Sequence, residues 1–166
     1  MRKIGFMLGG LVVLVGSFLI TNWILSKNNE GLNWRFTNEA TLAAAATAAG
    51  FHSSKDLSGS VDAVVRIDNE KVRANGWVVD LSGDGTPIKL SAFVNGLNIA
   101  TFDTDGPRLD VTEKIIKPNL RANQNSAKNT QFKASFPCAP GAKLFVVATT
   151  ATRSYLLLPH QPAACP

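Results

Sequence analysis

Hydrophobic and polar residues follow three successive patterns along the chain. Residues 4–25 form one uncharged apolar run, and residues 26–58 are polar or alanine-rich. From residue 59 onward, short apolar–polar alternations are separated by turn residues. A long apolar run predicts one membrane-spanning helix, whereas short alternating runs predict β-strands. We therefore divide the chain into an anchor at 1–25, a juxtamembrane stalk and spacer at 26–58, and a β-domain at 59–166.

The β-domain has about seven predicted strands, each a short run bounded by turn residues. They are residues 61–67, 71–80, 88–94, a run that starts at Leu97, 130–136, 143–150 and 154–158. Residues 111–121 contain Pro118 and predict an irregular crossing between sheets. Because no long helix interrupts the strands, we expect an all-β fold, an antiparallel immunoglobulin-like β-sandwich, behind the N-terminal transmembrane helix.

Two hairpins set the expected strand register. Asn95-Gly96 is a strong turn signal because both positions tolerate positive φ, and a two-residue turn there places Ala92 opposite Ile99. A second hairpin, with Ala151-Thr152 as its loop, would place Cys138 opposite Cys165. An oxidising compartment also favours pairing of cysteines. We therefore predict a disulfide bond between these two residues.

The spacer contains an alanine-rich segment that predicts a short helix, which Asn38 can cap and Gly50 can end. Its one large apolar residue is Leu42, so we expect it to bury little. Trp34 and Phe36 precede the helix, and amphipathic rings beside a membrane span are favoured at the headgroup layer. These two rings could therefore rest on that layer.

The apolar run at 4–25 is longer than the core of a secretory signal, which is about 7–15 residues. This length favours an uncleaved signal-anchor over cleavage after Ser17. Arg2 and Lys3 precede the run and are expected to stay in the cytoplasm, so the remainder is exported. The predicted location is the inner membrane, crossed once, with the C-terminal domain in the periplasm or outside.

The net charge of +5 does not predict a nucleic-acid partner, because much of it flanks the apolar run. Residues 28–105 carry 6 basic and 10 acidic side chains, whereas residues 106–166 carry 8 basic and 2 acidic side chains. Besides membrane lipid around residues 4–25, we expect the partner to be an envelope protein, an acidic glycan or a lipid surface.

Four short motifs resemble a known module. They are Gly76-Trp77-Val78-Val79-Asp80, Phe93-Val94-Asn95-Gly96, Arg108-Leu109-Asp110-Val111 and Phe132-Lys133-Ala134-Ser135-Phe136. Together they resemble the Gly-Trp-x-x-Asp β-sandwich module, immunoglobulin-like, of bacterial cell-envelope and glycosyltransferase-associated proteins. The resemblance spans roughly residues 59–158. It implies the fold more than any activity.

The stretch DLSGDG, which begins at Asp80, alternates carboxylates and a hydroxyl before a glycine, as in the first half of a calcium loop. Position twelve of such a loop would be Ser91 rather than a glutamate. A polar β-turn is therefore the preferred interpretation, with Asp80, Ser82 and Asp84 as weak calcium candidates. A second acidic turn, at residues 103–106, could share an ion if the two loops met.

Other candidate sites also have two interpretations. Trp77 could stack on a sugar, although a packed core tryptophan is preferred. Arg108 and Asp110 could hold a ligand or form a structural ion pair. His52 and His160 have no metal-ligand partner at a suitable spacing, and no nucleophile or phosphate-loop motif is present. We expect no catalytic residues, no resident metal and no cofactor.

These features predict a membrane-anchored extracytoplasmic module that binds or assembles with a partner and has no catalytic activity of its own. A first alternative is an accessory single-pass subunit of a larger membrane complex. The small residues Gly5, Gly9 and Gly16 would then allow close helix approach. A second alternative is a hydrolase whose site is built from loops.

Overall fold

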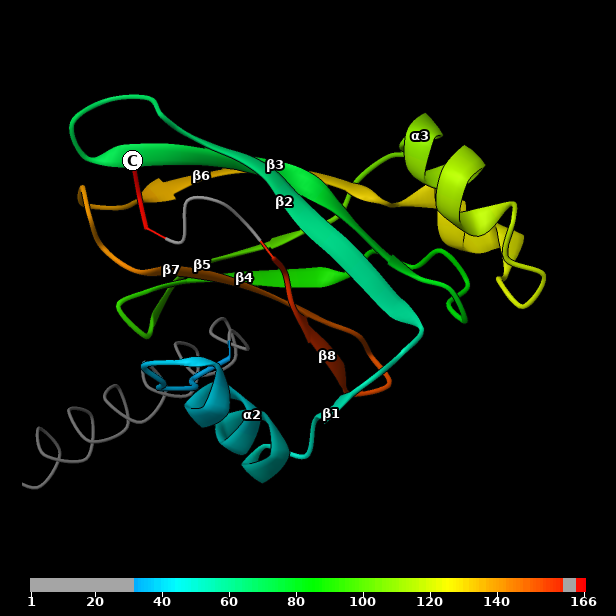
Figure 1. Cartoon of the computed structure of the whole chain (residues 1–166), viewed down its shortest axis with the longest axis horizontal. Coiled ribbons are helices and arrows are strands. Elements are labelled where there is room, and N and C mark those ends of the chain that lie inside the picture. The colour runs from blue at the N-terminus through cyan, green and yellow to red at the C-terminus, as the bar shows by residue number, and fades with distance from the viewer. Residues whose placement is uncertain (1–31, 160–163) are drawn as a thin grey trace, which may run out of the picture. The chain divides into compact units, whose positions relative to one another are not determined.

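The computed structural model describes residues 32–159 and 164–166 (Figure 1). The predicted membrane helix at 4–25 lies outside the described residues, as does His160. Among those that are described, no helix is long and apolar enough to cross a membrane. The chain from Asn33 to Pro166 forms one compact unit, so this unit includes most of the segment that we assigned to the spacer.

Two β-sheets make up most of this unit. The large sheet has five strands in the order β1-β8-β7-β4-β5, and the small sheet has three in the order β2-β3-β6. All pairings are antiparallel except the short β1–β8 pair. The strands are β1 (His52–Ser53), β2 (Leu57–Arg66), β3 (Lys71–Asp80), β4 (Lys89–Val94), β5 (Leu97–Asp103), β6 (Gln131–Pro137), β7 (Leu144–Thr149) and β8 (Ser154–Leu157). The prediction of an all-β, mostly antiparallel fold is confirmed, and β1 is the strand it missed.

Alternating side chains of both sheets meet in one apolar core between the two layers (Figure 1). The small sheet contributes Val72 from β3 and Phe136 from β6, and the large sheet contributes Leu90 from β4 and Val146 from β7. Successive residues of a strand point to opposite faces, so β3, β6 and β7 place alternate side chains in this core, whereas both residues of β1 are exposed. The side chains that alternate with these face outward, and several of them line a polar groove on the small sheet.

The β4–β5 hairpin departs from its predicted register. The turn at Asn95-Gly96 forms with positive φ at both residues, as expected. Ala92, however, pairs with Ala100 rather than with Ile99, because the register shifts by one residue inside the hairpin. The turn type determines only the first pairs, and a β-bulge then inserts an extra residue.

The segment before the strands covers the outer face of the large sheet. Trp34 and Phe36 are only 8% and 4% exposed. The ring of Phe36 lies 4.7 Å from that of Phe93 and 5.2 Å from that of Phe145, and Trp34 packs edge-on against Phe51. The prediction that Trp34 and Phe36 rest on the headgroup layer is therefore wrong. The outward rings of β4 and β7 provide an apolar surface within the protein itself.

The predicted short helix is present as α2 (Glu39–Ala48). The Asn38 side chain accepts a hydrogen bond from the Thr41 backbone N–H at 2.9 Å, and the Thr41 hydroxyl accepts one from the Asn38 N–H at 3.1 Å. This reciprocal pair is a capping box. Leu42 is 2% exposed, so α2 packs within the unit, contrary to the expectation that it buries little.

The segment between β5 and β6 is partly helical where we predicted an irregular crossing. It contains α3 (Leu109–Val111), η1 (Thr112–Ile116) and η2 (Gln124–Lys128). Val111 and Ile116 form a second small apolar cluster with Val79 of β3. This cluster fixes the segment against one end of the small sheet and positions Arg108, the residue that precedes α3.

Cys138 and Cys165 form the predicted pair, at disulfide distance and with their Cα atoms 6.1 Å apart. The register from which we predicted the pair is wrong, because Ala148 pairs with Leu156 instead of Tyr155. The loop between β7 and β8 has an extra residue, Arg153, in the left-handed region at φ 59°.

A separate short pairing places Cys165 beside Cys138. Lys143 forms an isolated antiparallel bridge with Ala164, and the Cys165 N–H donates to the Ala142 carbonyl at 2.9 Å. The bonded pair therefore depends on the return of the tail to the start of β7 and not on extension of the β7–β8 hairpin.

Candidate functional site

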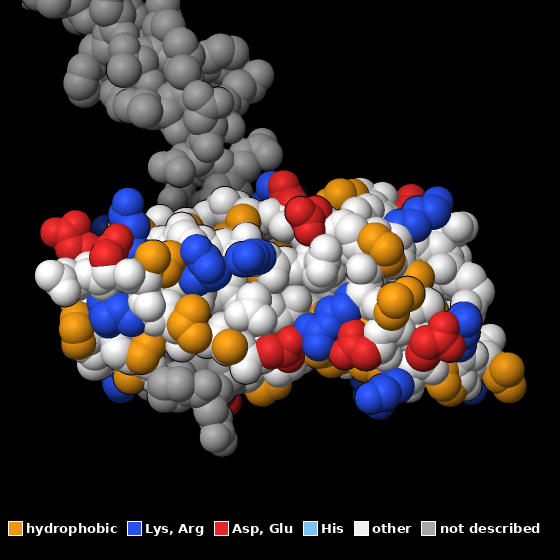
Figure 2. Space-filling model, turned by 90° about the horizontal axis from the view of Figure 1, so that it is seen from above, with side chains coloured by type: hydrophobic (Ala, Val, Ile, Leu, Met, Phe, Trp, Pro, Cys, Tyr) orange, Lys and Arg blue, Asp and Glu red, His pale blue; other side chains and the backbone are white. Residues whose placement is uncertain are grey.

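The outer face of the small sheet carries a polar groove of about 690 Å³. Its polar lining comes from β2, β3, β6 and the segment after β5, and consists of Asp62, Arg73, Asn75, Asp105, Arg108, Gln131 and Lys133. Figure 2 looks onto this side of the molecule and shows acidic and basic side chains interspersed over it. The groove therefore has no uniform charge, and its chemistry depends on which charges are already paired.

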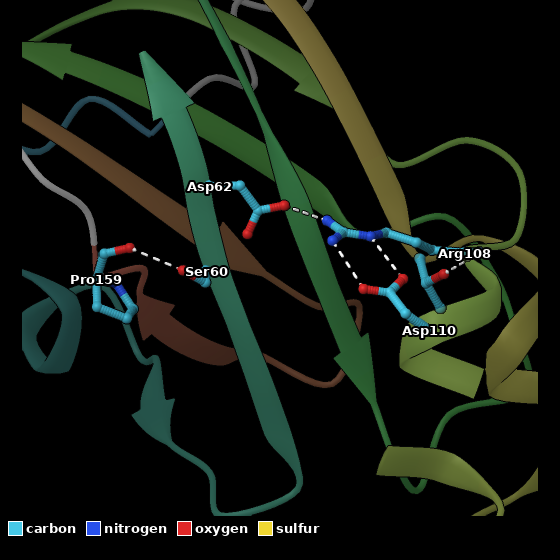
Figure 3. A network of polar contacts seen from close by, with 6 residues as sticks. Ser60, Asp62, Arg108, Asp110 and Pro159 are labelled. Carbon is cyan, nitrogen blue, oxygen red and sulfur yellow. Dashed lines mark hydrogen bonds and ion pairs between the residues drawn. The ribbon is translucent and has the colours of Figure 1, made fainter. Parts of the chain in front are cut away.

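The guanidinium of Arg108 is held by two carboxylates from different elements (Figure 3). Its Nε and Nη2 donate to the two carboxylate oxygens of Asp110, at 2.8 and 2.9 Å, and its Nη1 donates to Asp62. The hydrogen bonds from Arg108 hold the pKa of the Asp110 carboxyl below its usual value. This bidentate geometry is typical of strong arginine–carboxylate pairs. Arg108 and Asp110 thus form the structural ion pair that was one of our two interpretations.

Asp62 is a member of this network that the sequence did not indicate. The pairing of β2 with β3 shifts register between Val61 and Ala63, so Asp62 is the bulged residue. A bulge redirects a side chain, and here the Asp62 carboxylate meets Arg108 across β3 (Figure 3). The network links the edge strand β2 to the segment before α3, and it neutralises the positive charge of Arg108.

Two cations of the groove have no partner. In the part of the chain that the structure describes, the side chains of Arg73 and Lys133 make no hydrogen bond or ion pair, and neither do those of Asn75 and Gln131. Lys133 pairs with Asn75 and Ser135 with Arg73, so the two cations occupy diagonal positions on adjacent strands. Such positions are roughly 7–8 Å apart. Two neighbouring positive charges repel each other, and an anion bound between them offsets this repulsion by attracting both.

Trp77 points to the same outer face but packs beside the groove. It contacts the small cluster of Val79, Val111 and Ile116, and it does not line the groove. Its large ring supports the helical segment after β5, which differs from the predicted place in the main core. A sugar-stacking role for Trp77 stays a prediction.

The loop at Asp80 is folded by its own side chains. Asp80 Oδ1 accepts hydrogen bonds from the N–H and hydroxyl of Ser82, at 3.1 and 2.8 Å. Asp84 Oδ1 accepts from the hydroxyl and N–H of Thr86, and these bonds hold the pKa of Asp84 below its usual value. Local bonds of this kind are typical of Asx turns.

Metal binding by this loop stays untested. Over residues 32–159 and 164–166, no group of three or more His, Cys, Asp or Glu side chains could hold a metal ion. Asp103 of the second acidic turn pairs instead with Lys89, at 3.3 Å. Asp80, Ser82 and Asp84 therefore remain weak calcium candidates.

Among the described residues, His52 and Ser154 are the one pair in which a hydroxyl that could act as a nucleophile contacts a histidine that could act as a base. The Ser154 hydroxyl lies 3.1 Å from His52 Nε2. The two residues are direct partners in the β1–β8 pairing, which accounts for their proximity. No carboxylate in the described part of the chain bonds to His52, so the groups that would orient a catalytic histidine are not assembled here.

No protein-family model, curated protein or solved structure matches this chain. The fold and the site define a mostly antiparallel two-sheet protein that has a polar groove on its small sheet.

Proposed function

We propose that this protein is a membrane-anchored extracytoplasmic binding module with an immunoglobulin-like β-sandwich, and that its groove binds the anionic groups of an acidic glycan. The proposal includes no catalytic step. The observation that carries it is that Arg73 and Lys133 have no ion-pair partner, in a groove whose third cation, Arg108, is already paired and whose lining also includes the carboxylate of Asp105.

The strand order supports the immunoglobulin-like assignment. The orders β2-β3-β6 and β8-β7-β4-β5 correspond, along the chain, to strands A-B-E and G-F-C-C′ of the immunoglobulin architecture. The resemblance to the Gly-Trp-x-x-Asp module of envelope proteins points the same way. The bond between Cys138 and Cys165 joins the segments after strands E and G, whereas antibody domains join strands B and F.

The chemistry of the groove favours a glycan that carries carboxylate or sulfate groups. Arg73 and Lys133 supply charge, and the amides of Asn75 and Gln131 supply donors and acceptors for neighbouring hydroxyls. The groove is open along the sheet, so it fits an extended chain better than an enclosed small molecule. An anionic lipid headgroup presents similar charge and is distinguished in the experiment below.

Display outside the membrane is the second element of the proposal. A periplasm-active reporter fused to the C-terminal end is expected to be active, because Arg2 and Lys3 retain the N-terminus in the cytoplasm. The N-terminus of the purified protein is expected to be uncleaved. Activity of a cytoplasm-only reporter, or a mature N-terminus at Phe18, would contradict the topology or the anchor respectively.

The groove is tested by the double variant Arg73→Gln/Lys133→Gln in the full chain. Binding to a sulfated or uronic-acid polysaccharide is expected to fall at least tenfold, since each charged hydrogen bond contributes about 1.5–3 kcal/mol. Binding of the unmodified protein should weaken as salt rises. Titration calorimetry against these polymers, neutral dextran and anionic vesicles measures the effect.

The matched control is Lys55→Gln/Lys143→Gln, which removes the same charge from exposed positions that do not line the groove. An equal loss in both double variants would mean that net charge alone drives binding. Binding to vesicles but not to the polysaccharides would assign the groove to lipid headgroups, and binding to neither would refute the proposal.

A further inference from the structure

The polar groove on the small sheet contains a carboxylate that the proposed function does not use. Asp105 lines the groove and is exposed. Its backbone N–H donates to the Gln131 carbonyl at 2.8 Å, and the two residues form an isolated antiparallel bridge, so their side chains are neighbours on one face. The side chain of Asp105 makes no ion pair within the part of the chain that the structure describes. This carboxylate is therefore available to a ligand.

The two unpaired cations of the groove lie at increasing distances from Asp105. Lys133 is two residues beyond Gln131 on β6, so Asp105 and Lys133 occupy diagonal positions, roughly 7–8 Å apart. Arg73 is four residues from Trp77, the partner of Gln131 on β3, which corresponds to about 14 Å along the strand. No ion pair joins Asp105 to either cation among the described residues. One ligand can therefore meet the negative charge and the positive charges at the same time.

The network of Figure 3 adds negative charge to the groove. It contains the guanidinium of Arg108 and the carboxylates of Asp62 and Asp110, so it carries a formal charge of −1. The two unpaired cations are thus balanced by Asp105 and by this network. A wholly anionic ligand would place some of its charges beside these carboxylates, where like charges repel. A ligand that carries both signs of charge fits the groove better.

We propose that the groove binds a glycan that carries free amino groups as well as anionic groups, with an ammonium group against Asp105 and an anionic group between Arg73 and Lys133. This inference rests on the proposed function of the groove and specifies the ligand further. The ammonium group gains the one unpaired carboxylate of the groove lining, and the anionic group offsets the repulsion between the two cations.

The experiment compares two oligosaccharides of equal length that differ only in their amino groups. Both alternate glucuronate with glucosamine. In one the amines are N-acetylated, and in the other they are free and are protonated at slightly acidic pH. The full chain, in a neutral detergent, is titrated with each by calorimetry. The free-amine form is expected to bind about fivefold more tightly, which is the upper range for an exposed ion pair.

Net charge alone predicts the opposite order of affinity. The protein carries a formal charge of +5, and the free-amine oligosaccharide is the less anionic of the two. Non-specific attraction would therefore favour the N-acetylated form. Tighter binding of the free-amine form thus requires a carboxylate that recognises the ammonium group.

Asp105→Asn should abolish the preference and leave binding of the N-acetylated form at least as tight. Asp103→Asn is the matched control, because it removes the same charge from the same acidic turn at an exposed position that does not line the groove. It should keep the preference. Arg73→Gln/Lys133→Gln should weaken binding of both forms, because the anionic groups that they share lose their partners.

The outcomes separate this inference from the proposed function. Equal binding of the two forms, or tighter binding of the N-acetylated form, would overturn the inference. If Arg73→Gln/Lys133→Gln still weakened that binding, the groove would remain a site for acidic glycans. A preference that Asp105→Asn leaves intact would also overturn the inference, because the amino group would then be recognised elsewhere. Binding of neither form would refute both.

Discussion

Replacing Phe36 with alanine is expected to lower the free energy of unfolding by about 3–5 kcal/mol, the usual cost of removing a buried phenylalanine ring. Phe36 lies between the rings of Phe93 and Phe145 on the outer face of the large sheet. If residues 33–51 were only a stalk, the substitution would have almost no effect. Urea denaturation of the full chain, followed by tryptophan fluorescence, measures the change.

A fully exposed leucine provides the control for this substitution. Leu120→Ala is expected to change stability by no more than about 0.5 kcal/mol, because Leu120 is 101% exposed and packs against nothing that its loss would uncover. A Phe36→Ala protein as stable as Leu120→Ala would show that the aromatic segment does not dock on the sheet in solution.

A pair of glycines tests the same docking from the other side of the contact. Gly96 and Gly141 have nearly equal φ, 80° and 77°. A Cβ at Gly96 would lie 1.9 Å from the Phe36 carbonyl oxygen, whereas one at Gly141 would meet nothing within 4 Å. Gly141→Ala should cost about 1–2 kcal/mol from backbone strain alone. Gly96→Ala should cost clearly more, and equal costs would contradict the contact with Phe36.

Removing the disulfide is expected to lower the free energy of unfolding by about 3 kcal/mol, because the bond closes a loop of moderate length in the unfolded chain. The two cysteines are 27 positions apart. Both are buried in the apolar core, so the double variant Cys138→Ala/Cys165→Ala avoids burying a hydroxyl. Denaturation of the full chain with and without reductant measures the contribution.

The double alanine variant also serves as the control for the reductant, which should no longer affect stability. The loss of stability should be concentrated in the C-terminal tail. Arg66 donates hydrogen bonds to the carbonyl groups of Cys138 and Pro166. These bonds join the two segments only while both segments are in place. Quantitative alkylation of both thiols in protein purified without reductant would show that the bond does not form.

Local signals predicted a large part of this fold. The strand at Lys71–Asp80 and the helix capped by Asn38 match their predicted bounds closely, because alternation, a capping residue and turn glycines act over a few neighbouring residues. The turn at Asn95-Gly96 formed for the same reason. The Arg108–Asp110 pair was also within reach, since its members are two residues apart.

Such local signals could not predict the long-range contacts. Asp62 reaches Arg108 only because β2 bulges, and Phe36 is buried only because β4 and β7 turn aromatic rings toward it. The cysteine pair was predicted correctly from a register that the structure does not have. A bulge or an extra loop residue changes every later pair in a hairpin, and the local sequence does not indicate where such a residue is inserted.

The Gly76-Trp77 motif shows which features are determined by the sequence and which by the tertiary structure. The sequence by itself determined that a strand passes through these residues, because alternation is a property of neighbours. Only the tertiary structure decided why position 76 is glycine: a Cβ there would lie 2.2 Å from the Ser60 carbonyl oxygen of β2 and 2.7 Å from the ring of Phe132 of β6. The diagonal positions of Arg73 and Lys133 on adjacent strands have the same origin. These two residues are far apart in the chain, and their spacing is determined by sheet pairing instead of by local propensity.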